Sequence, residues 1–96
     1  MIVNIHSIHF DIDNDLEEFI EKKVNKLLKL DNKIISSDIF LKLSKAESYS
    51  NKIAEIKLKY PSSEFFAKRQ SNTFEESTTQ VFYALRKQIL KNKAKR

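Results

Sequence analysis

Apolar residues recur every three or four positions in two segments of the chain, which is the period of an amphipathic helix. In the first segment the apolar stripe consists of Leu16, Phe19, Ile20, Val24, Leu27 and Leu28. In the second segment it consists of Phe74, Thr78, Val81, Leu85 and Ile89. The spacing therefore predicts two helices, each of which buries one face against the rest of the molecule.

Both predicted helices begin with residues that can cap free backbone N–H groups. Asp13 or Asn14 can cap the first helix, and Asn14 with Glu17 has the spacing of a capping box. Thr73 with Glu76 has the same spacing at the start of the second helix. These residues predict where the two helices begin.

Elsewhere the apolar period changes to two, which is typical of strands. Four segments show this alternation: residues 2–10, 38–45, 53–60 and 64–71. The second and third segments each direct their apolar residues to one side: Ile39, Leu41 and Leu43, and then Ala54, Ile56, Leu58 and Tyr60. Turns are expected around residues 46–51 and around Pro61-Ser62-Ser63.

The predicted element order is β-α-β-β-β-α, which indicates an α+β fold. A right-handed crossover through the first helix makes the first two strands parallel, and the later strands follow as antiparallel hairpins. Because the strands have one polar face, both helices are expected on the same face of a four-stranded mixed sheet.

Composition narrows the possible classes of protein. A chain of 96 residues with 41% hydrophobic and 32% charged residues is typical of one folded domain, expected to span residues 1–96. The chain has no run of about 18 apolar residues, and its first residues lack the features of a secretion signal. We therefore expect a cytoplasmic protein without a membrane partner.

No catalytic or metal-binding motif is evident in the sequence. The segment Asp11–Asp15 resembles the start of a calcium loop, but Leu16 replaces the required glycine and Lys22 the required glutamate. His6 and His9 are three apart on a predicted strand, so their side chains are expected to point to opposite faces. We therefore expect no enzymatic activity, no metal, no cofactor and no small-molecule substrate.

The chain contains neither glycine nor cysteine. The absence of cysteine excludes disulfides and thiolate metal sites, and the absence of glycine excludes a glycine-rich phosphate loop. Without glycine, Asn32 is the residue expected to adopt a left-handed conformation after the first helix.

Charge is distributed with the same polarity along both helices. Residues 11–21 hold six acids and no base, whereas residues 22–29 hold four lysines and no acid. Glu76 is the last acid of the chain, and six cations follow from Arg86 to Arg96. This polarity suits the helix dipole, which contributes about 0.3–1 kcal/mol for each charge. The dipole does not explain two turns of uninterrupted cations.

The apolar stripes direct a set of cations away from the core. These cations are Lys22, Lys26, Lys29, Arg86, Lys87, Lys91 and Lys93, and Lys23 lies at the edge of its stripe, where it can snorkel. If the helices lie side by side, their C-terminal halves form one basic field suited to phosphates. The residues alone leave three interpretations open: a nucleic-acid partner, a solvated cationic face, or an anionic protein or membrane partner.

Three segments together resemble a known family in order, length and spacing. Residues 1–30 match the family's opening strand and helix. Residues 54–78 match its later strand, hairpin and the start of its second helix. Residues 85–95 match its closing L-x-[RK]-Q-[LI]-x-K-x-K pattern. The chain thereby resembles the short form of the ribosome hibernation-promoting factor and ribosome-associated translation inhibitor family. It departs from that family at Ser62-Ser63, where glycine is frequent, and around Thr78-Thr79, where aspartate is usual.

The resemblance implies a fold like that of double-stranded-RNA-binding domains. It also implies binding to 16S rRNA of the small ribosomal subunit, in the mRNA channel near the tRNA sites, which silences translation in stationary phase or stress. The rRNA contacts that it marks are Lys23, Lys26, Lys87, Lys91 and Lys93. No C-terminal dimerisation domain is expected, and the free protein is expected to be a monomer. The alternative is a general double-stranded-RNA-binding or protein-interaction module of similar fold.

Overall fold

The computed structural model of the protein describes residues 2–45 and 50–95. Its elements are β1 (Ile2–Ser7), α1 (Asn14–Leu30), β2 (Ser36–Leu43), β3 (Lys52–Lys59), β4 (Glu64–Ser71) and α2 (Phe74–Ala94). The order is the predicted β-α-β-β-β-α. Of the predicted turn at residues 46–51, residues 46–49 lie outside the described residues.

The strands form one four-stranded sheet in the order β1-β2-β3-β4. β1 pairs with β2 in parallel, whereas β2 with β3 and β3 with β4 are antiparallel. The register aligns one apolar row across all strands, in which Ile5 lies opposite Ile39, Ile39 opposite Ile56, and Ile56 opposite Ala67. The predicted mixed sheet is confirmed.

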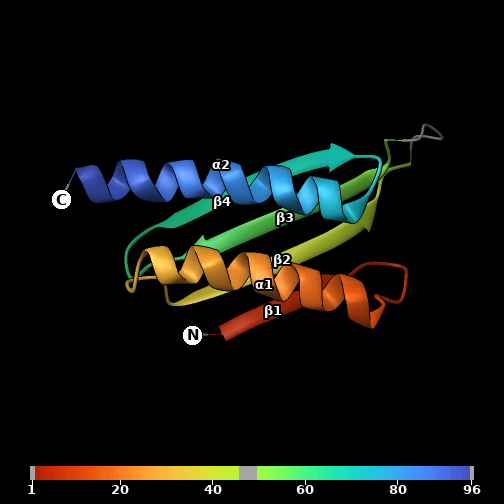
Figure 1. The fold of residues 1–96 in the computed structure, drawn as a ribbon, viewed down its shortest axis with the longest axis horizontal. Helices are drawn as coiled ribbons and strands as arrows, with labels where there is room; N and C mark the ends of the chain where they lie inside the picture. Colours follow the sequence, from red (N-terminus) through yellow and green to blue (C-terminus); the bar gives the residue numbers. More distant parts are fainter. Residues whose placement is uncertain (1, 46–49, 96) are drawn as a thin grey trace.

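Both helices cover the same face of this sheet, as predicted (Figure 1). α1 lies over β1 and β2, and α2 lies over β3 and β4. The two helices lie side by side and run in the same direction, so their C-terminal ends are at the same end of the molecule. The face is determined by the apolar row, because each helix must bury its own stripe.

The core lies between the sheet and the two helices. Its fully buried aliphatic side chains are Ile20, Val24, Leu27, Ile39, Leu41, Ile56, Leu58, Val81, Leu85 and Ile89. Burying one such side chain contributes about 1.5–3 kcal/mol. Leu43, predicted to face the core, is instead 46% exposed because it is the last residue of β2.

Both helices begin at a side-chain cap. Asp13 Oδ1 accepts a hydrogen bond from Leu16 N at 2.8 Å, and Thr73 Oγ1 accepts one from Glu76 N at 3.0 Å. Asn14 is already the first residue of α1. The cap at Thr73 is therefore confirmed, whereas the capping box that would start at Asn14 does not form.

The expected left-handed conformation at Asn32 is wrong. Among the described residues, only His9 has a positive φ, of 67°. α1 ends instead at the extended residue Asp31, whose carboxylate accepts hydrogen bonds from Lys33 N at 3.2 Å and from Tyr60 OH at 3.0 Å. Because this side chain satisfies the turn, the backbone does not need a left-handed residue.

The two histidines do not share a strand, which corrects the sequence-based expectation. β1 ends at Ser7, and the chain turns at His9 on its way to α1. In the ranges 2–45 and 50–95, no group of three or more histidine, cysteine or acidic side chains is placed to hold a metal ion. No helix within these ranges is sufficiently long and apolar to span a membrane.

Candidate nucleic-acid interface

The parallel helices bring two cationic segments to the same end of the molecule (Figure 1). The basic surface is defined by the eight predicted cations: Lys22, Lys23, Lys26, Lys29, Arg86, Lys87, Lys91 and Lys93. Seven of them are exposed, and Lys23 is half-buried. The helical periodicity explains this result, because their positions fall between those of the buried stripes.

Lys23 joins the two helices. Its Nζ lies 5.7 Å from the centre of the Phe19 ring on α1 and 5.1 Å from that of the Phe82 ring on α2. A cation over an aromatic ring is stabilised by the ring quadrupole, by about 0.5–1 kcal/mol at an exposed site. The side chain therefore does snorkel, and its charge lies between the Phe19 ring of α1 and the Phe82 ring of α2.

Lys93 also connects the helices, at their C-terminal ends. Its Nζ donates a hydrogen bond of 2.7 Å to the carbonyl oxygen of Leu30, the last residue of α1. That carbonyl is one of the acceptors that a helix end leaves without an intrahelical partner. Lys93 thus caps α1 and places its charge between the two helix ends.

Lys91 lies on the opposite flank of α2. It lines a shallow depression together with Phe65 of β4 and with Gln88, Asn92 and Lys95 of the helix end. Gln88 Nε2 donates to the carbonyl oxygen of Phe66, at 3.3 Å, on the same flank. The cations of α2 therefore lie on both of its flanks, with Lys93 beside α1 and Lys91 beside β4.

Ion pairs occur on the other face of the sheet. They are Lys42–Glu55 at 3.2 Å, Lys57–Glu64 at 3.7 Å and Lys68–Glu55 at 3.7 Å, and His6 Nε2 lies 3.9 Å from Asp38 Oδ1 on the same face. These residues alternate with the buried positions of their strands, so they point away from the helices. Within residues 2–45 and 50–95, none of the eight cations of the basic surface has a carboxylate within ion-pairing distance.

The acids of the helices lie at the other end of the molecule. Asp15 and Glu17 occupy the first turn of α1, and Glu75 and Glu76 that of α2. Because the helices are parallel, their acids and their bases are separated along the long axis of the molecule, which is 44 Å. This polarity directs an anionic partner to the C-terminal ends of the helices.

Two further cations extend the basic surface and were missed from the sequence. Lys33 is exposed on the loop after α1, and Lys95 is the exposed C-cap residue of α2. Lys95 belongs to the same cationic run as Lys91 and Lys93, so the sequence pattern could have identified it. Lys33 had no such signal, because only the fold brings its loop beside α2.

The basic surface offers charge-assisted contacts to phosphates, without a fixed donor and acceptor pattern that reads bases. Lysine and arginine on rigid helices suit the phosphates and shape of a folded RNA.

Comparison with known proteins relates this fold to ribosomal proteins. A family described as "Sigma 54 modulation protein / S30EA ribosomal protein" matches residues 3–96. A ribosomal subunit interface protein from Coxiella burnetii has a similar structure, with a TM-score of 0.86, 24% sequence identity, and coverage of 98% of this chain and 99% of that chain. The N-terminal domain of Protein Y from Thermus thermophilus has a TM-score of 0.75, 15% identity, and coverage of 90% and 91% respectively. At these identities the two structures establish the fold. No curated protein sequence matches the chain significantly.

Proposed function

The chain belongs to the Sigma 54 modulation protein / S30EA ribosomal protein family, a family of ribosome-associated proteins, and we propose that it is a hibernation factor that binds the small ribosomal subunit. The basic surface of α1 and α2 contacts phosphates of 16S rRNA. The bound protein occupies the mRNA channel near the tRNA sites and silences translation in stationary phase or stress. It acts in the cytoplasm, and it is a monomer when free.

One observation carries this proposal: within residues 2–45 and 50–95 none of the eight cations of the basic surface has a carboxylate partner, whereas three of the six cations on the strands have one. Lysines 42, 57 and 68 each have a carboxylate within 3.7 Å. The cations of the basic surface have none within the described ranges, although neutralising them would need only a few acids on neighbouring turns. A surface that keeps its charge uncompensated retains its full attraction for a polyanion.

The proposed inhibition is steric and requires no bond to be made or broken. A rigid domain held by phosphate contacts excludes mRNA and tRNA from the space that it fills. The likeness to a ribosomal subunit interface protein supports a position between or beside the subunits. The separation of charge along the long axis supports an orientation in which the basic end faces rRNA and the acidic end faces away from it.

The test is sedimentation of the purified protein with separated small and large subunits over a salt series, beside an in vitro translation reaction. We expect co-sedimentation with the small subunit and a dose-dependent loss of translation. The affinity should fall steeply with salt, by roughly 0.7–0.9 logarithmic units per phosphate contact for each tenfold rise in salt.

A generic RNA duplex added as competitor distinguishes the proposed function from the alternative RNA-binding module. The small subunit should be preferred, because its folded RNA presents phosphates on several sides of the protein. Equal competition by the duplex, or absence of co-sedimentation at low salt, would contradict the proposal.

A further inference from the structure

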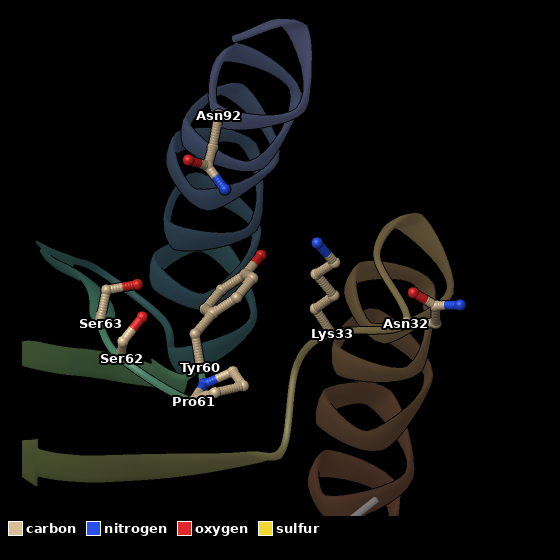
Figure 2. A pocket seen from close by; sticks show the side chains of 7 residues that line it. All are labelled: Asn32, Lys33, Tyr60, Pro61, Ser62, Ser63 and Asn92. Carbon is tan, nitrogen blue, oxygen red and sulfur yellow. The ribbon is translucent and has the colours of Figure 1, made fainter. Parts of the chain in front are cut away.

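A polar pocket of about 630 Å³ lies at the basic end of the molecule. It is lined by Asn32, Lys33, Tyr60, Pro61, Ser62, Ser63 and Asn92. Figure 2 shows these side chains on the loop after α1, at the β3–β4 turn and on the C-terminal half of α2, with the Tyr60 ring between the two serines and Lys33. Its volume is in the range of about 300–1,000 Å³ that is usual for sites of small ligands.

Five polar side chains of this pocket have no partner among the described residues. In the ranges 2–45 and 50–95, the side chains of Asn32, Lys33, Ser62, Ser63 and Asn92 make no hydrogen bond or ion pair. They come from three separate elements that line one pocket. Their donors and acceptors are therefore available to a ligand.

Tyr60 holds the walls of the pocket together through three contacts. The Tyr60 hydroxyl donates to Asp31 Oδ2 at 3.0 Å, and Tyr60 N donates to the carbonyl oxygen of Ser63 at 2.8 Å. The Tyr60 ring packs on that of Phe65, with 4.9 Å between ring centres. These contacts hold the β3–β4 turn against the end of α1, so the backbone that carries the free groups is in place before a ligand binds.

The charge of the lining is positive. Lys33 is the ionisable cation among the described lining residues, and no carboxylate lines the pocket. The nearby Asp31 is 3% exposed, and its carboxylate is engaged by Lys33 N and Tyr60 OH. An anionic group is therefore favoured over a cation or a neutral ligand.

We propose that this pocket binds a single ribonucleotide. The ammonium of Lys33 and the hydroxyls of Ser62 and Ser63 take the phosphate, because each donates to phosphate oxygens. The amides of Asn32 and Asn92 each present a donor beside an acceptor, which matches the edge of a base or the hydroxyls of a ribose. A bare anion would leave these amides unused.

Two kinds of ligand present such a nucleotide: a nucleotide turned out of an RNA strand, and a free nucleotide. Both present the same phosphate, ribose and base to the pocket. The lining contains none of the eight cations that define the basic surface, although Lys33 extends that surface. The proposal does not rest on ribosome binding, because its test uses the protein without ribosomes.

Titration of the isotope-labelled protein, followed by NMR, tests the proposal without ribosomes. The probes are adenosine 5′-monophosphate, adenosine, inorganic phosphate and a penta-adenylate RNA. Adenosine 5′-monophosphate should shift the amide resonances of Asn32, Lys33, Ser62, Ser63 and Asn92 in a saturable way. Adenosine and inorganic phosphate should each bind about tenfold more weakly, since each lacks one set of hydrogen bonds.

Two variants and one matched control assign the contacts. Lys33→Gln should weaken adenosine 5′-monophosphate about tenfold. Lys59→Gln removes the same charge from an exposed position that points to the other face of the sheet, and it should leave binding unchanged. Asn92→Ala should weaken the nucleotide and leave inorganic phosphate unaffected.

Three results would overturn the proposal: no saturable shift at the pocket, phosphate binding as tight as nucleotide binding, or equal effects of Lys33→Gln and Lys59→Gln. The affinity for the penta-adenylate, compared with that for the mononucleotide, identifies the source of the bound nucleotide, and both results below support the proposed site. Tighter binding than the mononucleotide indicates a residue of an RNA strand, and equal or weaker binding indicates a free nucleotide. If the protein failed to co-sediment with ribosomes, the result expected from this titration would be unchanged.

Discussion

Reversing the charge of Lys87 and Lys91 is expected to weaken binding to the small subunit by about 100-fold or more and to leave the fold intact. Both side chains are exposed on α2. Lys93 stays unchanged because its bond to the carbonyl of Leu30 also holds the helix ends together. The double variant Lys87→Glu/Lys91→Glu therefore separates the contribution of charge to binding from its contribution to folding.

The structure sets the magnitude of both effects. Lys91 lies in the last turn of α2, where reversing a charge against the helix dipole costs roughly 1 kcal/mol. Lys87 lies before that turn, where exposed substitutions change stability by about 0.5 kcal/mol or less. The sum is small beside a domain stability of about 5–15 kcal/mol. The melting temperature should fall by about 4–8 °C for each kcal/mol lost.

The effect on binding is larger. Each charge-assisted contact to a phosphate contributes about 1.5–3 kcal/mol, so losing two corresponds to about 100-fold or more in Kd. The slope of log Kd against log salt concentration should also become shallower by roughly 1.4–1.8, which corresponds to the loss of two phosphate contacts.

The assay is fluorescence anisotropy of labelled protein with purified small subunits at three salt concentrations, beside circular dichroism. The matched control is Lys45→Glu/Lys59→Glu, which changes the net charge equally at exposed positions outside the basic surface. A folded Lys87→Glu/Lys91→Glu protein with wild-type affinity would refute the reasoning, and so would an equal loss in the control. Either result would favour a solvated cationic face.

The remaining predictions concern stability. Lys93→Met should lower the free energy of unfolding by about 0.5–1.5 kcal/mol, because it removes the hydrogen bond to Leu30 O; thermal unfolding by circular dichroism measures this. Tyr60→Phe removes the hydroxyl that donates to the buried Asp31 and should cost about 1–3 kcal/mol, measured by urea unfolding. Asp13→Ala removes the N-cap of α1 and should cost about 0.5–2 kcal/mol in the same unfolding experiment.

Each stability prediction has a matched control. Tyr83→Phe removes a hydroxyl from a side chain that is 60% exposed and should change stability by about 0.5 kcal/mol or less. Lys22→Met removes a charge from an exposed position of α1 and serves beside Lys93→Met. Asp11→Ala removes an exposed carboxylate from the loop before α1 and serves beside Asp13→Ala. A variant that is no less stable than its control would contradict the interaction assigned to it.

The elements and their topology were predictable from the sequence because their signals are local. An apolar stripe at helical spacing or an alternating strand needs only neighbouring residues to be recognised. The expected strand at residues 38–45 agrees with β2 at Ser36–Leu43, and that at 64–71 agrees with β4. The parallel pairing of β1 with β2 followed from the helical crossover between them, and the chirality of the backbone determines the hand of that crossover.

The ends of elements were less predictable, because several residues compete for each of them. Asp13 and Asn14 are both good caps, and the structure uses Asp13. Asn32 was expected to turn the chain after α1, but the carboxylate of Asp31 is drawn into a buried hydrogen bond with Tyr60, which is far away in sequence. Such a partner is not visible in the local pattern.

The sequence by itself determined that the eight cations avoid the core, since their positions fall between those of the apolar stripes. Only the tertiary structure decided which way each one faces: Lys93 reaches the end of α1, whereas Lys91, two residues earlier, lies against the flank at β4. It also assembled the polar pocket from Asn32-Lys33, residues 60–63 and Asn92. The physical reason is that a helix turns about 100° per residue, so the neighbours of a side chain depend on how the helices and the sheet pack.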